Sequence, residues 1–134
     1  MIALPKKILF ICVWNSCRSQ MAEAFASFHG GGRIEAYSAG TKPSGKIDAL
    51  TIRYMREVGY DLSQQLSKSL SQVPNIEYDV VVNMASADQL PKVTAKRTVH
   101  WEVQNPKKLS AEGFRRVRGF IEDKVKQLLS SLQT

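Results

Sequence analysis

The stretch KILFICVWNSCRS, residues 7–19, joins an apolar run to a polar loop that carries a cysteine and an arginine. The apolar run Lys7–Ile11 is rich in residues that favour strands, and Pro5 bounds it upstream, so a buried strand is expected here. Cys12 follows the run directly, and five residues separate it from Arg18. This order predicts a loop that holds an anion beside a thiolate nucleophile.

A helical pattern begins directly after this loop and ends at the glycines 30–32. The apolar residues that recur at the spacing of one helix face are Met21, Ala22, Phe25 and Phe28. A helix N-terminus presents unpaired N–H groups and partial positive charge, which attract an anion and favour the thiolate form of a nearby cysteine. We therefore expect the loop to bind the substrate anion through Val13, Trp14, Asn15, Ser16 and Cys17.

The two ends of the loop would have different roles. Cys12 would attack the bound anion, and Arg18 would bind two of its oxygens through the planar guanidinium. The alternative interpretation makes Cys12 a small buried apolar residue at the end of a strand. The order of strand, loop and helix favours the catalytic interpretation, because a structural cysteine would not require that order.

Length and composition are those of one ordinary globular domain. The chain has 134 residues, of which 43% are hydrophobic and 23% are charged. No apolar run is long enough to span a bilayer and the first residues show no signal peptide, so we expect a cytoplasmic protein without a membrane partner. The net charge of +7 comes from single or paired basic residues, which favours a solvated basic surface over nucleic-acid binding. We expect a monomer whose surface steers an anionic substrate.

Two cysteines and two histidines limit the metal and redox chemistry of the chain. His29 and His100 are isolated in the sequence, so we expect neither a metal site nor a cofactor. In a reducing compartment Cys12 and Cys17 would be thiols. Under oxidation they could form a transient disulfide that protects both from irreversible oxidation.

Strand-like and helix-like segments alternate along the chain, which predicts an α/β fold with a parallel sheet covered by helices on both faces. The expected strands are 7–11, 34–38, 79–84 and 97–101. A helical stripe over 47–58 ends at Gly59, and Ser110 caps a long C-terminal helix. The polar stretch 61–78 holds at most a short helix. In such sheets ligands bind at the carboxyl ends of the strands, where Cys12 would lie.

The loop Cys12–Ser19 resembles the signature loop of the low-molecular-weight protein tyrosine phosphatases and the related thioredoxin-coupled arsenate reductases. Further blocks resemble this family in the same order, and the helix start is similar to that of the arsenate reductase branch. These blocks are Ser19–Ala24, Tyr37–Thr41, Gly59–Ser63, and His100–Trp101 followed by Asn105–Pro106. The resemblance implies a single domain over residues 1–134, a three-layer sandwich in which helices flank a four-stranded parallel sheet.

The resemblance also implies roles for individual residues. Cys12 would attack phosphorus or arsenic and form a covalent thiol ester, while Arg18 and the loop N–H groups stabilise the transition state. Ser19 would donate a hydrogen bond to the thiolate. Asn15 and Ser38 would hold the shape of the loop by side-chain hydrogen bonds. For Ser19, Asn15 and Ser38 the alternative is ordinary capping or turn chemistry.

The chain departs from the family pattern at three places. Trp14 replaces the glycine usual in the phosphatases and is either an aromatic rim of the pocket or a surface residue. The resolving cysteines that follow strand 79–84 in the arsenate reductases are absent, so arsenate reduction would need an external thiol. Asn105 stands where the family has an aspartate general acid, and an amide cannot give up a proton at neutral pH. Glu102 or Asp88 could replace that acid.

Three functions follow from these features. The intact set of Cys12, Arg18 and Ser19 favours a phosphatase that hydrolyses phosphotyrosine or small aryl phosphates through a phosphocysteine intermediate. The alternative is an arsenate reductase that uses an external thiol reductant such as glutathione. The third function, which rests on Asn105, is that of an oxyanion-binding protein with weakened turnover.

Overall fold

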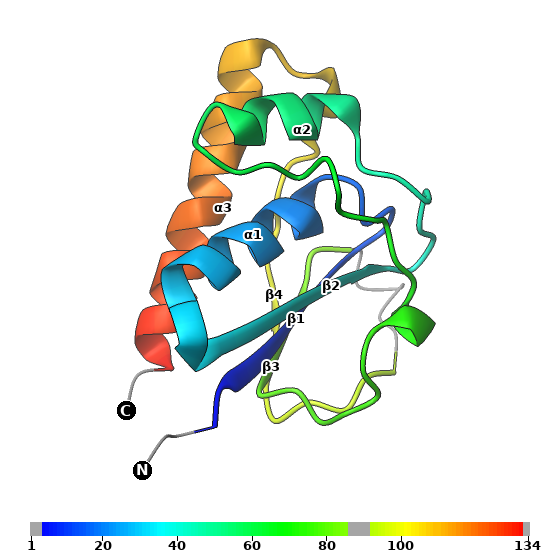
Figure 1. The fold of residues 1–134 in the computed structure, drawn as a ribbon, viewed down its shortest axis with the longest axis vertical. Coiled ribbons are helices and arrows are strands. Elements are labelled where there is room, and N and C mark those ends of the chain that lie inside the picture. Colours follow the sequence, from blue (N-terminus) through cyan, green and yellow to red (C-terminus); the bar gives the residue numbers. More distant parts are fainter. Residues whose placement is uncertain (1–3, 86–91, 133–134) are drawn as a thin grey trace.

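Four parallel strands form one sheet in the order β2-β1-β3-β4 (Figure 1). The computed structural model describes residues 4–85 and 92–132. The strands are β1 (Lys6–Cys12), β2 (Ile34–Gly40), β3 (Val80–Asn83) and β4 (Thr98–His100). The predicted four-stranded parallel sheet is confirmed, and each strand ends within two residues of its predicted bounds.

Three α-helices cover one face of this sheet (Figure 1). They are α1 (Arg18–Gly30), α2 (Ala49–Arg56) and α3 (Ala111–Ser131). Ile8 and Phe10 of β1 point to this face and are fully buried. They share one apolar cluster with residues of every helix, among them Phe25, Met55 and Ile121. Burial of this continuous cluster is the main term that holds the helices on the sheet.

Turns cover the opposite face in the described part of the chain. Leu9 and Ile11 of β1 share a second buried cluster with Val73 and Tyr78. Helical cover on this face is limited, among the described residues, to the 3₁₀ helix η2 (Leu70–Gln72). Within the described residues the α-helical cover predicted for both faces is therefore found on one face only. The physical reason is that the polar connection after α2 has no apolar helical stripe.

Local signals set the ends of two helices as predicted. The Ser110 hydroxyl accepts the N–H of Gly113 at 3.1 Å and caps α3. Gly59 has a φ of +93°, a conformation that favours glycine, and this turn lets the N–H of Tyr60 bond the carbonyl of Met55 at 3.0 Å. The chain therefore turns sharply after α2 and continues into the polar stretch 61–78.

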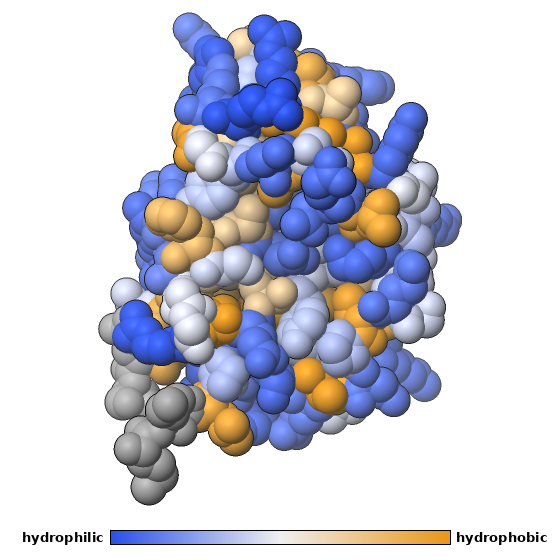
Figure 2. Space-filling view, in the orientation of Figure 1, coloured by the Kyte–Doolittle hydropathy of each residue, from blue (hydrophilic) through white to orange (hydrophobic). Residues whose placement is uncertain are grey.

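Two aromatic residues of the helical stripes lie at the surface. Phe28, which the helical pattern places on the same face as the buried Met21 and Phe25, is 69% exposed, and Phe120 of α3 is 47% exposed. Both lie at the edge of an apolar stripe that is wider than the contact with the sheet. Figure 2 shows apolar residues scattered over a largely hydrophilic face. None of the described helices has an apolar stretch long enough to cross a bilayer.

The strand order places the end of β1 at a reversal in the topology. β1 lies between β2 and β3, so the chain leaves β1 toward one edge of the sheet and later returns to its other side. Such a reversal opens a crevice at the carboxyl end of the strand, where open α/β sheets bind ligands. Cys12 is the last residue of β1, so the fold puts the predicted loop at this position.

Candidate active site

The anion loop, residues 12–18, has its carbonyl groups bonded to the segment 41–48, which passes along its outer side. The bonds run from Thr41 N to Cys12 O (3.1 Å), Lys42 N to Val13 O (2.8 Å), Ser44 N to Trp14 O (3.1 Å) and Asp48 N to Ser16 O (3.0 Å). Across a trans peptide the C=O of one residue and the N–H of the next point in opposite directions. Outward carbonyls therefore turn the loop N–H groups inward, which is the arrangement that binds an anion.

Cys12 lies inside the loop with 3% of its surface exposed. Its Sγ lies 2.8 Å from Ser19 Oγ and accepts the backbone N–H of Asn15 at 3.3 Å. The Asn15 side-chain amide donates to the same Ser19 oxygen at 2.8 Å, so the Ser19 hydroxyl proton is available to the sulfur. Two hydrogen-bond donors are therefore directed at this sulfur. The arrangement suits a nucleophile.

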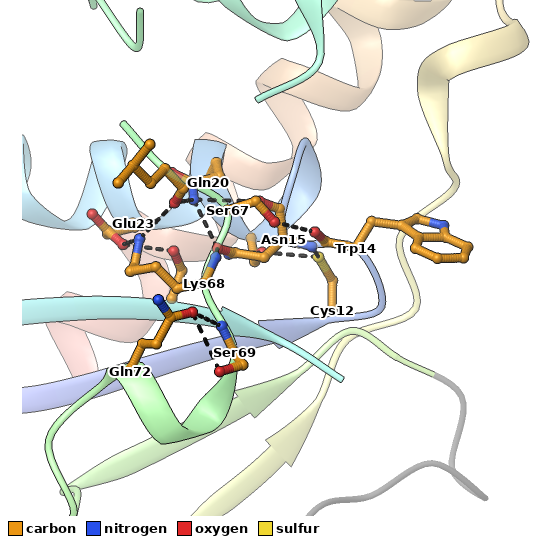
Figure 3. A network of polar contacts seen from close by, with 12 residues as sticks. Cys12, Trp14, Asn15, Gln20, Glu23, Ser67, Lys68, Ser69 and Gln72 are labelled. Atoms are coloured by element: carbon orange, nitrogen blue, oxygen red, sulfur yellow. Dashed lines mark hydrogen bonds and ion pairs between the residues drawn. The ribbon is translucent and has the colours of Figure 1, made fainter. Parts of the chain in front are cut away.

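Asn15 joins the anion loop to its surroundings (Figure 3). Its φ of +48° is the only positive value at a non-glycine residue within the described part of the chain, and asparagine tolerates this conformation. Its Oδ1 accepts from Gln20 Nε2 at 2.9 Å and from the backbone N–H of Lys68 at 2.7 Å. Gln20 also donates to the carbonyl of Leu66 at 3.0 Å. These bonds tie the loop, α1 and the segment 66–68 together.

Trp14 is held by its backbone while its ring points away from the polar network (Figure 3). Its carbonyl accepts the Ser67 hydroxyl at 2.7 Å in addition to the Ser44 N–H. The residue is 45% exposed and its φ is not positive, so the indole requires no unusual backbone angle where the phosphatases have glycine. Trp14 was interpreted either as a rim of the pocket or as a surface residue. Both interpretations predict an exposed ring, so the exposure does not separate them.

Ser38 lies at α1 and not at the anion loop. Its hydroxyl donates to Oε1 of Glu23 at 2.6 Å, so the prediction that Ser38 bonds the loop is wrong. The register of β2 directs this side chain toward the helix, and the loop receives its support from the segment 66–68 instead. Burial raises the pKa of the Glu23 carboxyl, while the bond from Ser38 and the charge of Lys68 act in the opposite direction.

Cys17 is buried where α1 begins, and its surroundings disfavour the thiolate. It is 4% exposed, and this burial raises the pKa of its thiol from 9.0 to about 12. The negative charge of Asp48 acts in the same direction. A thiol with such a pKa remains protonated at neutral pH and is a poor nucleophile. The two cysteines of the loop therefore differ in chemistry.

Two contacts tie the segment 103–107 to the anion loop. The guanidinium of Arg18 donates to the carbonyl of Val103 at 2.9 Å. The ammonium of Lys107 donates to the hydroxyl of Ser16 at 3.2 Å. The segment that carries the predicted acid position is therefore a neighbour of the loop, although more than 80 residues separate the two in sequence.

Asn105 is exposed on this segment and caps the 3₁₀ helix η4 (Pro106–Lys108). Its Oδ1 accepts the backbone N–H of Lys107 at 3.2 Å. Of the two carboxyls considered as replacement acids, Glu102 is exposed on the neighbouring stretch and Asp88 lies outside the described residues. Among the residues that the structure does describe, no group of three or more His, Cys, Asp or Glu side chains could hold a metal ion.

Several residues of the site carry no signal in the sequence pattern. They are Gln20, Gly40, Ser67, Lys68 and Lys107. Gln20 and Gly40 belong to blocks that resemble the family, which is the one signal that could have pointed to them. The other three stand in polar stretches without periodicity, and their contacts are with residues far away in the chain.

Gly40 leaves no room for a side chain beside the anion loop. A Cβ there would lie 2.6 Å from the carbonyl oxygen of Val13 and 3.0 Å from the backbone nitrogen of Asn15. We expect Gly40→Ala to displace the loop and lower the free energy of unfolding by about 1–3 kcal/mol. Urea unfolding measures this change. The matched control is Gly119→Ala in α3, which has nothing within 4 Å and should gain about 0.5–1 kcal/mol. Equal stability of the two variants would contradict the prediction.

The contrast between the two cysteines predicts selective alkylation. At pH 8 iodoacetamide is expected to modify Cys12 well before Cys17, because only about one Cys17 thiol in 10⁴ is ionised when its pKa is about 12. In urea both should react at similar rates, since the burial that separates them is lost. Peptide mapping by mass spectrometry measures the two rates. Fast modification of Cys17 in the folded protein would show that its thiol is not shielded.

The fold and the site define an enzyme class in which a cysteine thiolate acts inside an oxyanion-binding loop at the end of a parallel strand. The chain belongs to the family described as low molecular weight phosphotyrosine protein phosphatase, whose model matches residues 7–134. The family predicted from the loop and the accompanying blocks is thereby confirmed.

Several similar proteins are named as arsenate reductases. A glutaredoxin arsenate reductase of Synechocystis sp. is 38% identical over 130 residues, which cover 95% of this chain and 98% of that protein. An arsenate reductase of Halalkalibacterium halodurans is 37% identical over 132 residues, covering 90% and 93%. A solved arsenate reductase in the phosphate-binding state matches with a TM-score of 0.86 and 37% identity over 96% of this chain and 99% of that one. Vibrio vulnificus Wzb in complex with benzylphosphonate, at 22% identity and a TM-score of 0.76, shares the fold over 95% and 99%.

Proposed function

We propose that this protein reduces arsenate to arsenite with electrons from an external thiol. The observation that carries the proposal is the similarity, over nearly the whole chain, to relatives named arsenate reductases. The site agrees with it, because arsenate and phosphate are both tetrahedral oxyanions. Inward N–H groups and the guanidinium of Arg18 suit either anion. The comparisons therefore favour this function over the phosphatase that the sequence placed first.

The first step is a displacement at arsenic. The Cys12 thiolate attacks, an S–As bond forms, and an As–O bond breaks; the oxygen leaves as hydroxide and takes a proton to become water. Arsenic keeps its oxidation state, As(V), in this adduct. Arg18 and the loop N–H groups stabilise the charge on the remaining oxygens. Asn105 cannot supply the proton, so it comes from solvent or another group.

The second step is the reduction. An external thiolate attacks the Cys12 sulfur, an S–S bond forms, the S–As bond breaks, and its electron pair leaves with arsenic as As(III) arsenite. A second thiol then reduces the mixed disulfide and restores Cys12. Cys17 is unsuited to the attack because its pKa is about 12, and the chain has no third cysteine. An external donor therefore completes the cycle.

The test is arsenite formation by the purified protein with three separate electron donors. These are glutathione with glutaredoxin, reduced thioredoxin, and dithiothreitol. Arsenite that rises with both protein and thiol supports the proposal, and the preferred donor identifies the reductant. Absence of arsenite with all three donors would rule the proposal out.

Hydrolysis of aryl phosphates is the second candidate function. The lack of resolving cysteines favours it, because hydrolysis of a phosphocysteine needs water and no reductant. Turnover of para-nitrophenyl phosphate between pH 5 and pH 7 tests this activity. A rate no higher than that of a Cys12→Ser variant would exclude it.

A further inference from the structure

A lysine ammonium lies at the anion loop in a place that no sequence pattern predicted. Lys107 Nζ donates to Ser16 Oγ at 3.2 Å, across 91 residues of sequence. We propose that Lys107 is a second cation for the substrate oxyanion, beside Arg18, and stabilises the departing oxygen where the family's acid is missing. That the substrate anion is arsenate rests on the proposed function. That the site binds a tetrahedral anion with the help of Lys107 is independent of the proposed function.

The ammonium of Lys107 has hydrogen-bond donors that its contact with Ser16 leaves unused. Lys107 is half-buried, whereas its neighbour Lys108 is exposed. Within the described residues its ammonium makes this single hydrogen bond and forms no ion pair with a carboxylate. An ammonium carries three N–H donors, so two are available to a ligand. Arg18 belongs to the anion loop and Lys107 contacts it, so both positive charges would attract an anion bound in the loop.

Two neighbouring residues fix the backbone that carries Lys107. The buried Pro106 restricts the turn, and Asn105 Oδ1 accepts the Lys107 N–H at 3.2 Å. Asn105 thus caps η4 and holds the residue that reaches the loop. Where the family places a proton donor, this chain places an amide cap followed by a fixed positive charge.

The charge of Lys107 also acts on a buried thiol of the loop. It lowers the pKa of the Cys17 thiol, against the larger effect of burial and against the charge of Asp48. A purely structural role would be to offset the charge of Asp48, although no ion pair joins the two within the described contacts. In that case removal of the ammonium would change stability and leave anion affinity unchanged.

Titration with inorganic phosphate by calorimetry, at neutral pH and low salt, tests the inference. We expect Lys107→Met to raise the Kd for phosphate about tenfold, while Lys107→Arg stays within about threefold of the wild type. The matched control Lys108→Met should bind as the wild type does. A Kd within twofold of wild type for Lys107→Met, or equal weakening in Lys108→Met, would overturn the inference. Thermal unfolding of each variant establishes that the comparison is made between folded proteins.

Alkylation of Cys12 gives a second readout that needs no turnover. Iodoacetate is an anion and iodoacetamide is neutral, so the ratio of their rates at Cys12 reports the positive charge beside the sulfur. The ratio is expected to fall about fivefold to tenfold in Lys107→Met and to remain unchanged in Lys108→Met. An unchanged ratio in Lys107→Met would overturn the inference even if the affinity changed. Phosphate binding and Cys12 alkylation can both be measured even if the wild type reduces no arsenate. Failure of the proposed function can therefore be distinguished from failure of this inference.

Discussion

Replacement of Cys12 by serine is expected to lower arsenate reduction by at least about 10⁴-fold, to the background rate. A serine hydroxyl is not ionised at neutral pH, and its oxygen can form neither the S–As bond nor the disulfide that reduction requires. Phosphate binding should persist, because the inward N–H groups and Arg18 are unchanged. Arsenite formation and calorimetric phosphate binding measure the two effects on the same preparation.

Cys17→Ser is the matched control, since it also removes one thiol from the anion loop. We expect it to keep activity within about threefold of the wild type, because a thiol with a pKa of about 12 contributes little thiolate to resolve the adduct. An equally complete loss in both variants would mean that Cys17 attacks the adduct from within the chain. That result would contradict the mechanism with an external thiol.

Asn105→Asp is expected to raise the hydrolysis of para-nitrophenyl phosphate at least about tenfold, since a positioned general acid contributes about 10²–10⁴-fold. The segment 103–107 is tied to the anion loop, so a carboxyl at this position is close to the site. Aspartate also keeps the cap, because its oxygen can accept the Lys107 N–H as Asn105 does. The gain should be larger at pH 5 than at pH 7, since the acid must be protonated to act. Initial rates across this range measure it.

The control for this gain is Glu102→Gln in the wild-type background. If Glu102 already donates the proton, its replacement lowers the basal rate and Asn105→Asp adds nothing. If both variants leave the rate unchanged, position 105 is not the acid position in this chain. The expected pattern is a gain in Asn105→Asp together with no loss in Glu102→Gln.

The elements around Cys12 could be predicted because their residues are contiguous. Lys7–Ile11 has the composition of a buried strand, and the polar loop and helix pattern follow without interruption, so local sequence defines strand, loop and helix. The caps at Gly59 and Ser110 are likewise set by residues within a few positions. Phe28 shows where such reasoning fails, because periodicity identifies an apolar stripe and not how much of it the sheet covers.

The amino-acid sequence by itself determined the family, the four parallel strands, and the position of Cys12 between the first strand and the polar loop. These properties depend on residue order over short distances. Only the tertiary structure decided what supports the loop. Lys68 contacts Asn15 and Ser67 contacts Trp14 across 53 residues, Lys107 contacts Ser16 across 91, and Ser38 turns to Glu23 instead of the loop. Such contacts depend on the path of the backbone in space, which residue types and spacing along the chain do not specify.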